Sequence, residues 1–226
     1  MDYVRPASLA VLLSGTGTTL QNLIDVQAAG ELPAKIAVVL SSNPNAYGVI
    51  RAQQAGIGVE IVNRKEFNDP VVFADAVNAR LERFDFDLIV LAGYNHLVKL
   101  DRRRNIPAIN IHPALIPSFC GKGLYGDRVH KAVLDYGVRF TGVTVHFVDE
   151  EYDHGPVILQ EPVEVRYGDT VDSLRSRVQQ VEHRLYPTAI KLFVEGRLRI
   201  EGRTVVILPR QKDEGGRMKD EERSNE

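Results

Sequence analysis

The stretch SLAVLLSGTGTTLQNLI, residues 8–24, predicts a buried strand, a tight glycine turn and a helix. Residues 8–13 are apolar or small throughout, as in a strand that is covered on both faces. Beyond the glycines, apolar residues recur from Leu20 to Ala28 at the 3.6-residue spacing of a helix. A strand, a turn and a helix in this order begin a βαβ unit, so we expect an α/β fold.

The same alternation continues along the chain to Pro113. The expected strands are Lys35–Leu40, Val59–Val62, Leu88–Ala92 and Ala108–Ile111, and the expected helices are Tyr47–Ala55 and Pro70–Phe84. Because these strands are apolar throughout, the pattern predicts an open, mostly parallel twisted sheet with helices on both faces.

The part of the chain after Pro113 has a mixed pattern. We expect a glycine loop at Ser118–Gly126, a helix at Arg128–Tyr136, strands at Gly142–Val148 and Val157–Val165, a helical region at Thr170–Glu195 interrupted at Pro187, and a hairpin of Leu198–Ile200 with Thr204–Leu208. From Pro209 onward, 11 of 18 residues are charged. The prediction is one domain, residues 1–208, and a disordered charged tail, residues 209–226.

Composition narrows the class of protein. The 226 residues are 44% hydrophobic and 26% charged, which excludes a wholly disordered chain. The net charge of −2 gives no basic excess for nucleic acid, and no apolar run approaches the ~20 residues of a membrane span. The single Cys120 excludes an intrachain disulfide, and no signal peptide is visible, so we expect a cytoplasmic protein without nucleic-acid or membrane partners.

The turn Ser14–Thr19 is the first candidate site. Its glycines and the free N–H groups that open the helix suit a phosphate, with Thr18 or Thr19 as hydroxyl donors. No lysine follows as in a P-loop, and the third glycine of the dinucleotide fingerprint is missing. A tight turn with a threonine cap explains the residues equally well.

Asn110 and His112 form the second candidate site. Residues two apart on a strand share a face, and Pro113 keeps His112 extended. An amide and an imidazole at the carboxyl end of a strand could stabilise an oxyanion. A capping asparagine and a buried histidine with its hydrogen bonds satisfied are the alternative.

The acidic turn Asp149–Gly155 is the third candidate, because Asp153 could face His112 and handle a proton. Solvated loop charges are the simpler interpretation of this turn. His146 is either a partner behind the site or a plain sheet residue, and Cys120 has no neighbouring base. No Cys/His cluster has zinc spacing, so we predict no metal.

Several motifs, taken in order, resemble a known family. They are Ser14-Gly15-x-Gly-x-x-Leu20, Leu91-Ala92-Gly93-Tyr94, Asn110-Ile111-His112-Pro113, Val145-His146-Phe147-Val148, Asp153-x-Gly155-Pro156 and Glu182-His183-x-Leu185-Tyr186-Pro187. The chain resembles the phosphoribosylglycinamide formyltransferases, a family of the folate-dependent formyltransferase superfamily, over about residues 8–208. The resemblance implies a Rossmann-like formyltransferase fold.

The resemblance also implies residue roles. The catalytic residues would be Asn110, His112 and Asp153; the ribonucleotide would bind to Gly17, Thr18, Thr19, Gln179 and Glu182; and the folate would bind to Tyr94, Asn95, His96, Leu97, Val98, Asn110, Val148 and Asp149. Relatives commonly carry Met-Arg-Ile-Leu where this chain has residues 95–98, so Asn95-His96 is a departure. The loop Cys120–Gly123 is longer than in some relatives.

The implied reaction is formyl transfer from 10-formyltetrahydrofolate, the co-substrate, to the amine of glycinamide ribonucleotide. Asn110 and His112 would stabilise the oxyanion, and Asp153 would hold His112 protonated or order a water that moves the proton. Water, an amino-sugar nucleotide and a transfer RNA are alternative acceptors in the superfamily, and a non-catalytic nucleotide-binding module is the alternative of another class. We expect small-molecule substrates and a monomer or homodimer.

Overall fold

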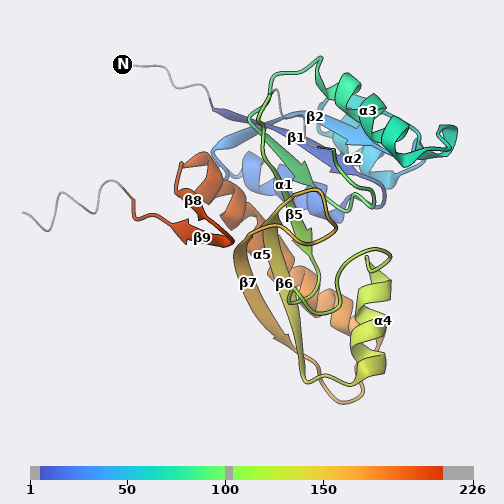
Figure 1. Cartoon of the computed structure of the whole chain (residues 1–226), viewed down its shortest axis with the longest axis vertical. Helices are drawn as coiled ribbons and strands as arrows, with labels where there is room; N and C mark the ends of the chain where they lie inside the picture. Colours follow the sequence, from blue (N-terminus) through green and yellow to red (C-terminus); the bar gives the residue numbers. More distant parts are fainter. Residues whose placement is uncertain (1–5, 100–103, 211–226) are drawn as a thin grey trace, which may run out of the picture.

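The sheet of this protein runs through the whole fold. The structure is a computed structural model and describes residues 6–99 and 104–210. Within these residues one sheet has nine strands in the order β3-β2-β1-β4-β5-β6-β7-β9-β8 (Figure 1). Strands β1 to β5 are parallel, β6 runs antiparallel to both β5 and β7, and β9 is parallel to β7 and antiparallel to β8. The predicted α/β fold, mostly parallel at first and mixed after Pro113, is confirmed.

The elements follow the predicted order. The strands are β1 Ala7–Leu13, β2 Ala34–Ser41, β3 Val59–Ile61, β4 Leu88–Leu91, β5 Ala108–His112, β6 Phe140–Phe147, β7 Val157–Glu164, β8 Leu198–Glu201 and β9 Thr204–Ile207. The α-helices are α1 Thr18–Ala28, α2 Tyr47–Gln54, α3 Pro70–Leu81, α4 Asp127–Tyr136 and α5 Val171–Val194, and a 3-10 turn covers Arg64–Glu66.

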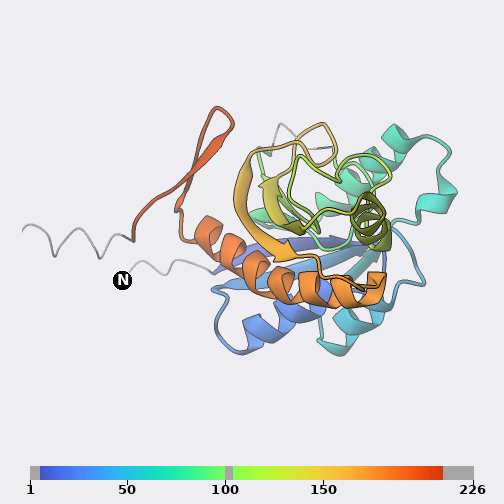
Figure 2. The ribbon, with the colours of Figure 1, turned by 90° about the horizontal axis from the view of Figure 1, so that it is seen from below.

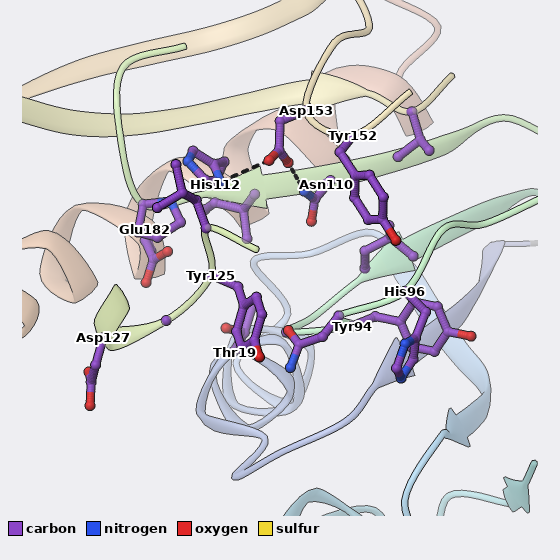
Figure 3. A pocket seen from close by; sticks show the side chains of 18 of the residues that line it. Thr19, Tyr94, His96, Asn110, His112, Tyr125, Asp127, Tyr152, Asp153 and Glu182 are labelled. Atoms are coloured by element: carbon purple, nitrogen blue, oxygen red, sulfur yellow. Dashed lines mark hydrogen bonds and ion pairs between the residues drawn. The ribbon is translucent and has the colours of Figure 1, made fainter. Parts of the chain in front are cut away.

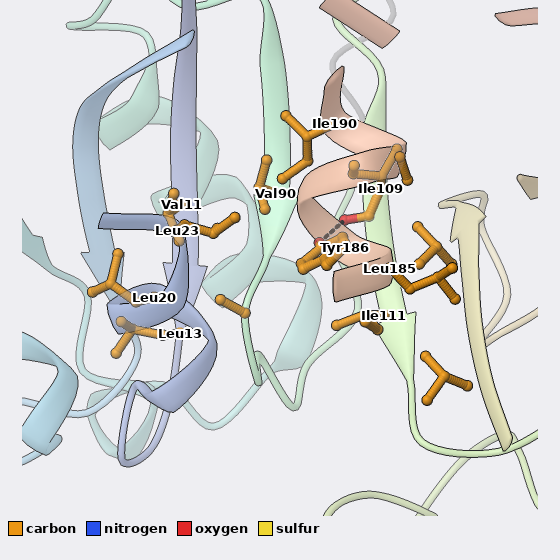
Figure 4. Packing of buried hydrophobic residues seen from close by; sticks show 14 of the residues in the cluster. Val11, Leu13, Leu20, Leu23, Val90, Ile109, Ile111, Leu185, Tyr186 and Ile190 are labelled. Atoms are coloured by element: carbon orange, nitrogen blue, oxygen red, sulfur yellow. Dashed lines mark hydrogen bonds between the residues drawn. The ribbon is translucent and has the colours of Figure 1, made fainter. Parts of the chain in front are cut away.

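Helices cover both faces of the sheet (Figure 2). Leucines of α1, together with residues of α2, α4 and α5, pack on one face in the larger hydrophobic cluster, part of which is drawn in Figure 4. Phe73, Val77 and Leu81 of α3 pack on the other face. This burial explains why β4 is apolar at every position and β1 at every position except Ser8.

The expected interruption at Pro187 is wrong, because α5 continues through it as one helix. The neighbouring Tyr186 is fully buried, and its hydroxyl lies 2.9 Å from the carbonyl oxygen of Leu91 and 3.0 Å from that of Ile109 (Figure 4). Since these carbonyls belong to β4 and β5, Tyr186 fixes the helix to the two central strands.

The strand order reverses between β1 and β4, which is where open α/β sheets bind ligands. The segments that follow these two strands meet there. The backbone N–H of Ser14 donates to the carbonyl of Gly93 at 3.1 Å, and the backbone N–H of Asn95 donates to the Ser14 hydroxyl at 3.2 Å. The predicted phosphate turn and the predicted folate segment therefore lie side by side.

Residues 211–226, most of the predicted tail, lie outside the described residues. Among the helices that the structure describes, none is long and apolar enough to cross a membrane.

Candidate active site

A pocket of about 1000 Å³ opens at the carboxyl ends of β1, β4 and β5. Its walls come from the turn before α1, the segment after β4, the loop before α4, the acidic turn after β6, and α5 (Figure 3). Most of the predicted site residues line it: Thr18, Thr19, Tyr94, Asn95, His96, Leu97, Val98, Asn110, His112, Val148, Asp153, Gln179 and Glu182. The volume suits two small organic ligands bound side by side.

Asn110, His112 and Asp153 form a single cluster in this pocket (Figure 3). The Asn110 side-chain amide donates to Asp153 Oδ1 at 3.3 Å, and His112 Nδ1 lies 3.6 Å from Asp153 Oδ2. The amide of Gly121 also donates to Asp153 Oδ2, at 2.9 Å. The strand therefore places Asn110 and His112 on one face, and Asp153 faces both from another loop.

The protonation of His112 follows from its contacts. His112 is 3% exposed, and its Nε2 lies 2.9 Å from the carbonyl oxygen of Phe119, so this nitrogen carries a proton and donates it. Burial lowers the pKa of His112 below its usual value, and the charge of Asp153 offsets this only in part. A pKa below that of an ordinary imidazole favours neutral His112 near pH 7, in contrast to the expectation that Asp153 keeps His112 protonated.

Asp153 is an ionised carboxylate in this environment. Burial by itself would raise its pKa, but the nearby imidazoles of His146 and His112 and the hydrogen bond from the Gly121 amide outweigh burial, and the pKa is lowered. Its backbone has φ 53°, a left-handed conformation that is uncommon for residues other than glycine. A charged acceptor beside two imidazoles is suited to ordering a water or taking a proton.

His146 belongs to this cluster, in agreement with the interpretation that it is a partner behind the site and not a plain sheet residue. It is 1% exposed, its Nδ1 lies 2.7 Å from the Phe147 carbonyl oxygen, and its Nε2 lies 3.7 Å from Asp153 Oδ1. The Asn110 amide nitrogen is 3.4 Å from the same Nε2. His146 thus supports Asn110 and Asp153 from behind.

The glycine turn leaves the first helical amides of α1 without a side-chain cap. Gly17 is the N-cap with φ 71°, and no side chain caps the helix, so the alternative of a threonine cap is wrong. A Cβ on Gly17 would lie 2.5 Å from Gly48 Cα, which explains why this position is glycine. Gly17 itself is not among the lining residues, whereas Thr18 and Thr19 are.

Sequence reasoning missed the role of Arg51 at this end of the pocket. Arg51 Nε donates to the carbonyl of Thr16 at 3.0 Å, and Arg51 Nη1 donates to Gln21 Oε1 at 2.9 Å. Arg51 also lines the pocket, so it braces the turn and places a positive charge beside it. No local motif marks this contact, because Arg51 lies on α2.

Glu182 and Gln179 enter the pocket from α5, one helical turn apart. Burial raises the pKa of Glu182 to about 7, because few polar partners compensate for lost water. A carboxylate that gains hydrogen-bond donors from a ligand would recover that lost solvation. Glu182 is therefore suited to sugar hydroxyls rather than to a charged group.

The segment Tyr94–Val98 forms the opposite wall. The ring of His96 makes edge contacts with Phe73 at 5.2 Å and Tyr94 at 5.3 Å. Burial and the nearby Arg64 lower the pKa of His96, so it is neutral at pH 7. His96 thus fills its position by ring packing and does not supply the positive charge of the arginine that relatives commonly carry.

Asp149 is the one predicted folate residue whose side chain the structure places elsewhere. It is not among the lining residues, and its Oδ2 lies 2.7 Å from His154 Nδ1. Its Oδ1 accepts from the Glu151 amide at 3.0 Å. The Asp149 carboxylate is therefore engaged within the acidic turn, and the contact of Asp149 with the folate stays a prediction.

Sequence reasoning also missed residues of the loop before α4 and of α4 itself. Phe119 and Gly121 contact the cluster through backbone groups, which no side-chain motif reveals. His130 is buried, lines the pocket and has an Nδ1 without a hydrogen-bond partner; burial lowers its pKa to about 4. Cys120 does not line the pocket, and burial and Asp153 raise its pKa, which is unlike a nucleophile.

In the part of the chain that the structure describes, no group of three or more His, Cys, Asp or Glu side chains could hold a metal ion.

Comparisons with known proteins show the family of the chain. The formyl transferase family model matches residues 7–190. A phosphoribosylglycinamide formyltransferase of Haemophilus influenzae is 40% identical over 195 residues, which cover 85% of this chain and 90% of the relative. A trifunctional purine biosynthetic protein of Bos taurus is also 40% identical, but this chain spans only 19% of its length.

Solved structures give the same result. The crystal structure of glycinamide ribonucleotide transformylase 1 from Symbiobacterium toebii has a TM-score of 0.83 and 42% identity, and the match covers 90% of this chain and 94% of that one. The chain therefore belongs to the formyl transferase family, in its phosphoribosylglycinamide formyltransferase branch.

Proposed function

We propose that this protein transfers the formyl group of 10-formyltetrahydrofolate to the amine of glycinamide ribonucleotide, a step of purine (IMP) biosynthesis. One observation carries the proposal: the Asn110–His112–Asp153 cluster lies in the same pocket as the uncapped N-terminus of α1. A catalytic group for acyl transfer and a place for a phosphate are thus combined in one cavity. Relatives named for this reaction support it.

The two ligands occupy opposite ends of the pocket. The phosphate of the ribonucleotide binds to the amides of Gly17, Thr18 and Thr19, beside the guanidinium of Arg51, and Gln179 and Glu182 bind its ribose. The folate lies along Tyr94–Val98 and reaches Asn110 and Val148. Asp149 contributes by shaping its loop, because its carboxylate contacts His154.

The reaction needs no protein nucleophile. The amine attacks the formyl carbon, its C–N bond forms, and the carbonyl oxygen becomes an oxyanion. Asn110 Nδ2–H donates to that oxygen, and so does His112 Nε2–H once it leaves the Phe119 carbonyl. The C–N bond to the folate then breaks. The proton that the amine loses reaches the folate nitrogen through a water held by ionised Asp153.

The other acceptors make different demands on the site. A hydrolase would place water where the amine attacks and would not need the α1 terminus or Glu182. A transfer RNA would need a positively charged surface, which a net charge of −2 does not favour. A module that only binds nucleotides would not need the ionised Asp153 beside two imidazoles.

One assay separates these possibilities. The absorbance change of the folate is followed after the protein is mixed with 10-formyltetrahydrofolate, either with glycinamide ribonucleotide or without an acceptor. The proposal predicts rapid change only with the ribonucleotide. Equal rates with and without it would indicate a hydrolase, and no change in either mixture would indicate a binding module.

We further propose that residues 1–208 form a single domain and that the protein acts in the cytoplasm on small molecules as a monomer or homodimer. The free thiol of Cys120 supports a reducing compartment. Equilibrium sedimentation distinguishes the two oligomeric states.

A further inference from the structure

The turn that carries Asp153 is anchored from outside the pocket. Arg203 Nη2 donates to the backbone carbonyl of His154 at 2.6 Å, and Arg203 Nη1 lies 3.1 Å from His154 Nε2. Arg203 stands in the turn between β8 and β9 and is 49 residues from His154 in sequence. One guanidinium thus holds both the main chain and the side chain of the residue that follows Asp153.

These contacts agree on a single tautomer of the His154 ring. The guanidinium can only donate, so His154 Nε2 must accept and carry no proton. The proton then lies on Nδ1, which donates to Asp149 Oδ2 at 2.7 Å. Asp149 in turn accepts the Glu151 amide at 3.0 Å. A continuous chain of contacts therefore links Arg203, through His154, to the start of the acidic turn.

The sheet places Arg203 at this point. β9 joins β7 as a parallel neighbour through the pair Val157 and Thr204. The residues that precede these two therefore also lie close together, and they are the end of the acidic turn and Arg203. The hairpin otherwise projects from the body of the protein (Figures 1 and 2).

Asp153 needs such an anchor. Its left-handed backbone, with φ 53°, costs free energy that its surroundings must offset. Two residues further along, a Cβ on Gly155 would lie 2.0 Å from the Phe147 carbonyl oxygen, so the turn is tightly folded at its end. The Asp153 carboxylate must also stay within reach of Asn110, His112 and the Gly121 amide at once.

We infer that Arg203 is a positioning residue for catalysis: through His154 it fixes the turn that aims Asp153 at His112. This deepens the proposed function and rests on it. Arg203 does not line the pocket, so it can act only through the position of the turn. Its effect should appear in kcat and in the KM for the folate, because the turn and Val148 border the proposed folate site. Ribonucleotide affinity, determined at the other end of the pocket, should not change.

The test compares Arg203→Ala with Arg199→Ala. Arg199 lies on the same hairpin and pairs with Glu201, away from the acidic turn. We expect Arg203→Ala to lower kcat about three- to tenfold, as for the loss of one or two ordinary hydrogen bonds. The dissociation constant of the ribonucleotide should stay within about twofold, and Arg199→Ala should leave all constants unchanged.

Two further measurements isolate the route through His154. In Arg203→Ala/His154→Ala, kcat should fall by less than the product of the two single-variant losses, because both changes remove the same contact between the Arg203 and His154 side chains. Hydrogen exchange of the Gly121 amide, which donates to Asp153, should be faster in Arg203→Ala than in Arg199→Ala. Fully additive losses, or equal kcat and equal exchange in the two arginine variants, would overturn the inference.

The exchange measurement also separates this inference from the proposed function. If the unmodified protein transferred no formyl group, the proposed function would fail. Faster exchange at Gly121 in Arg203→Ala alone would still show that Arg203 holds the turn, and unchanged exchange would refute it.

Discussion

The two ends of the pocket are held in place in different ways. At the phosphate end, where we propose that the ribonucleotide phosphate binds, β1, the glycine turn and α1 follow one another within residues 7–28, and the proposed site is the point where the strand becomes a helix. At the other end, Asp153 is held by Gly121, 32 residues away, and Asn110, 43 residues away. The first end is a product of local chain geometry, whereas the second depends on long-range contacts in the antiparallel half of the sheet.

This difference has consequences for substitutions. A change at the phosphate end should alter folding first, because the same residues form the turn and the binding site. A change at the Asp153 end should alter the reaction first, because its contacts are polar and few. The following predictions test that contrast.

The largest effect is expected for Asn110→Ala. The amide donor to the oxyanion is lost, which in comparable sites costs about 2.7–4 kcal/mol in the barrier, so kcat should fall about 10²- to 10³-fold. The melting temperature should change little, because Asn110 contributes polar contacts in a pocket rather than core packing. Steady-state kinetics and a thermal melt measure both, and a loss of less than tenfold would contradict the assigned role.

At the phosphate end, Gly17→Ala should instead destabilise the fold by about 2–3 kcal/mol, because it combines a left-handed backbone with a backbone contact at 2.5 Å. Gly15→Ala is the matched control: no atom lies within 4 Å of its Cβ position, and the change should cost less than about 0.5 kcal/mol. Urea unfolding measures the difference. Equal stabilities would mean that the turn is not constrained as described.

Glu182→Gln should stabilise the protein, but only at higher pH. The carboxyl has a pKa of about 7 when folded against its usual 4.5, so the folded state holds the proton more tightly. Stability is therefore lost as the pH rises from about 4.5 through 7, and glutamine avoids this loss. We expect a gain of roughly 1–2 kcal/mol at pH 8 and none at pH 4, because Glu182 retains some solvent contact in the pocket.

The same variant should bind the ribonucleotide more weakly at pH 8, because a carboxylate accepts hydroxyl hydrogen bonds more strongly than an amide. Calorimetric titration tests the affinity, and unfolding at the two pH values tests the stability. If the stability difference between Glu182→Gln and the unmodified protein were the same at both pH values, Glu182 would be ionised and well solvated in the folded protein.

The smallest effect is expected for Tyr186→Phe, in the region that both ends share. The hydroxyl bridges the carbonyls of β4 and β5, so its removal should cost about 1–2 kcal/mol of unfolding free energy. Tyr167→Phe, at a fully exposed position, is the control and should cost nothing measurable. Equal stabilities would remove Tyr186 as the link between α5 and the sheet.

The contrast also explains what the sequence could predict. Strand and helix positions follow from apolar patterns, because β1, β4 and β5 are largely buried on both faces. Asn110 and His112 share a strand, so their common face follows from the two-residue period. The helical continuation through Pro187 could not be predicted from local rules, because tertiary packing of residues such as Tyr186 and Ile190 overrides them.

Other parts of the site depend on contacts that leave no local pattern. Phe119 and Gly121 act through backbone groups, and Arg51 and Arg203 come from distant elements. The neutral state of His112 follows from burial, which outweighs the nearby carboxylate. A sequence shows that charge but not the extent of desolvation, so the direction of the shift could not be predicted.

The ionised carboxylate of Asp153 is the central element of this account, and Asp153→Asn tests it most directly. The change keeps the shape and removes the charge. Glu150→Gln, on the same turn and outside the pocket lining, is a better control than Glu151, which lines the pocket. The measurement is kcat for both variants, with a binding titration of the ribonucleotide.

We expect Asp153→Asn to lower kcat at least ~10²-fold, because Asp153 handles a proton in the proposed reaction. The affinity for the ribonucleotide should stay within about twofold. Glu150→Gln should leave both values nearly unchanged. If Asp153→Asn instead retained the kcat of Glu150→Gln, Asp153 would not act in the reaction, and the cluster around His112 would be a structural feature of the fold.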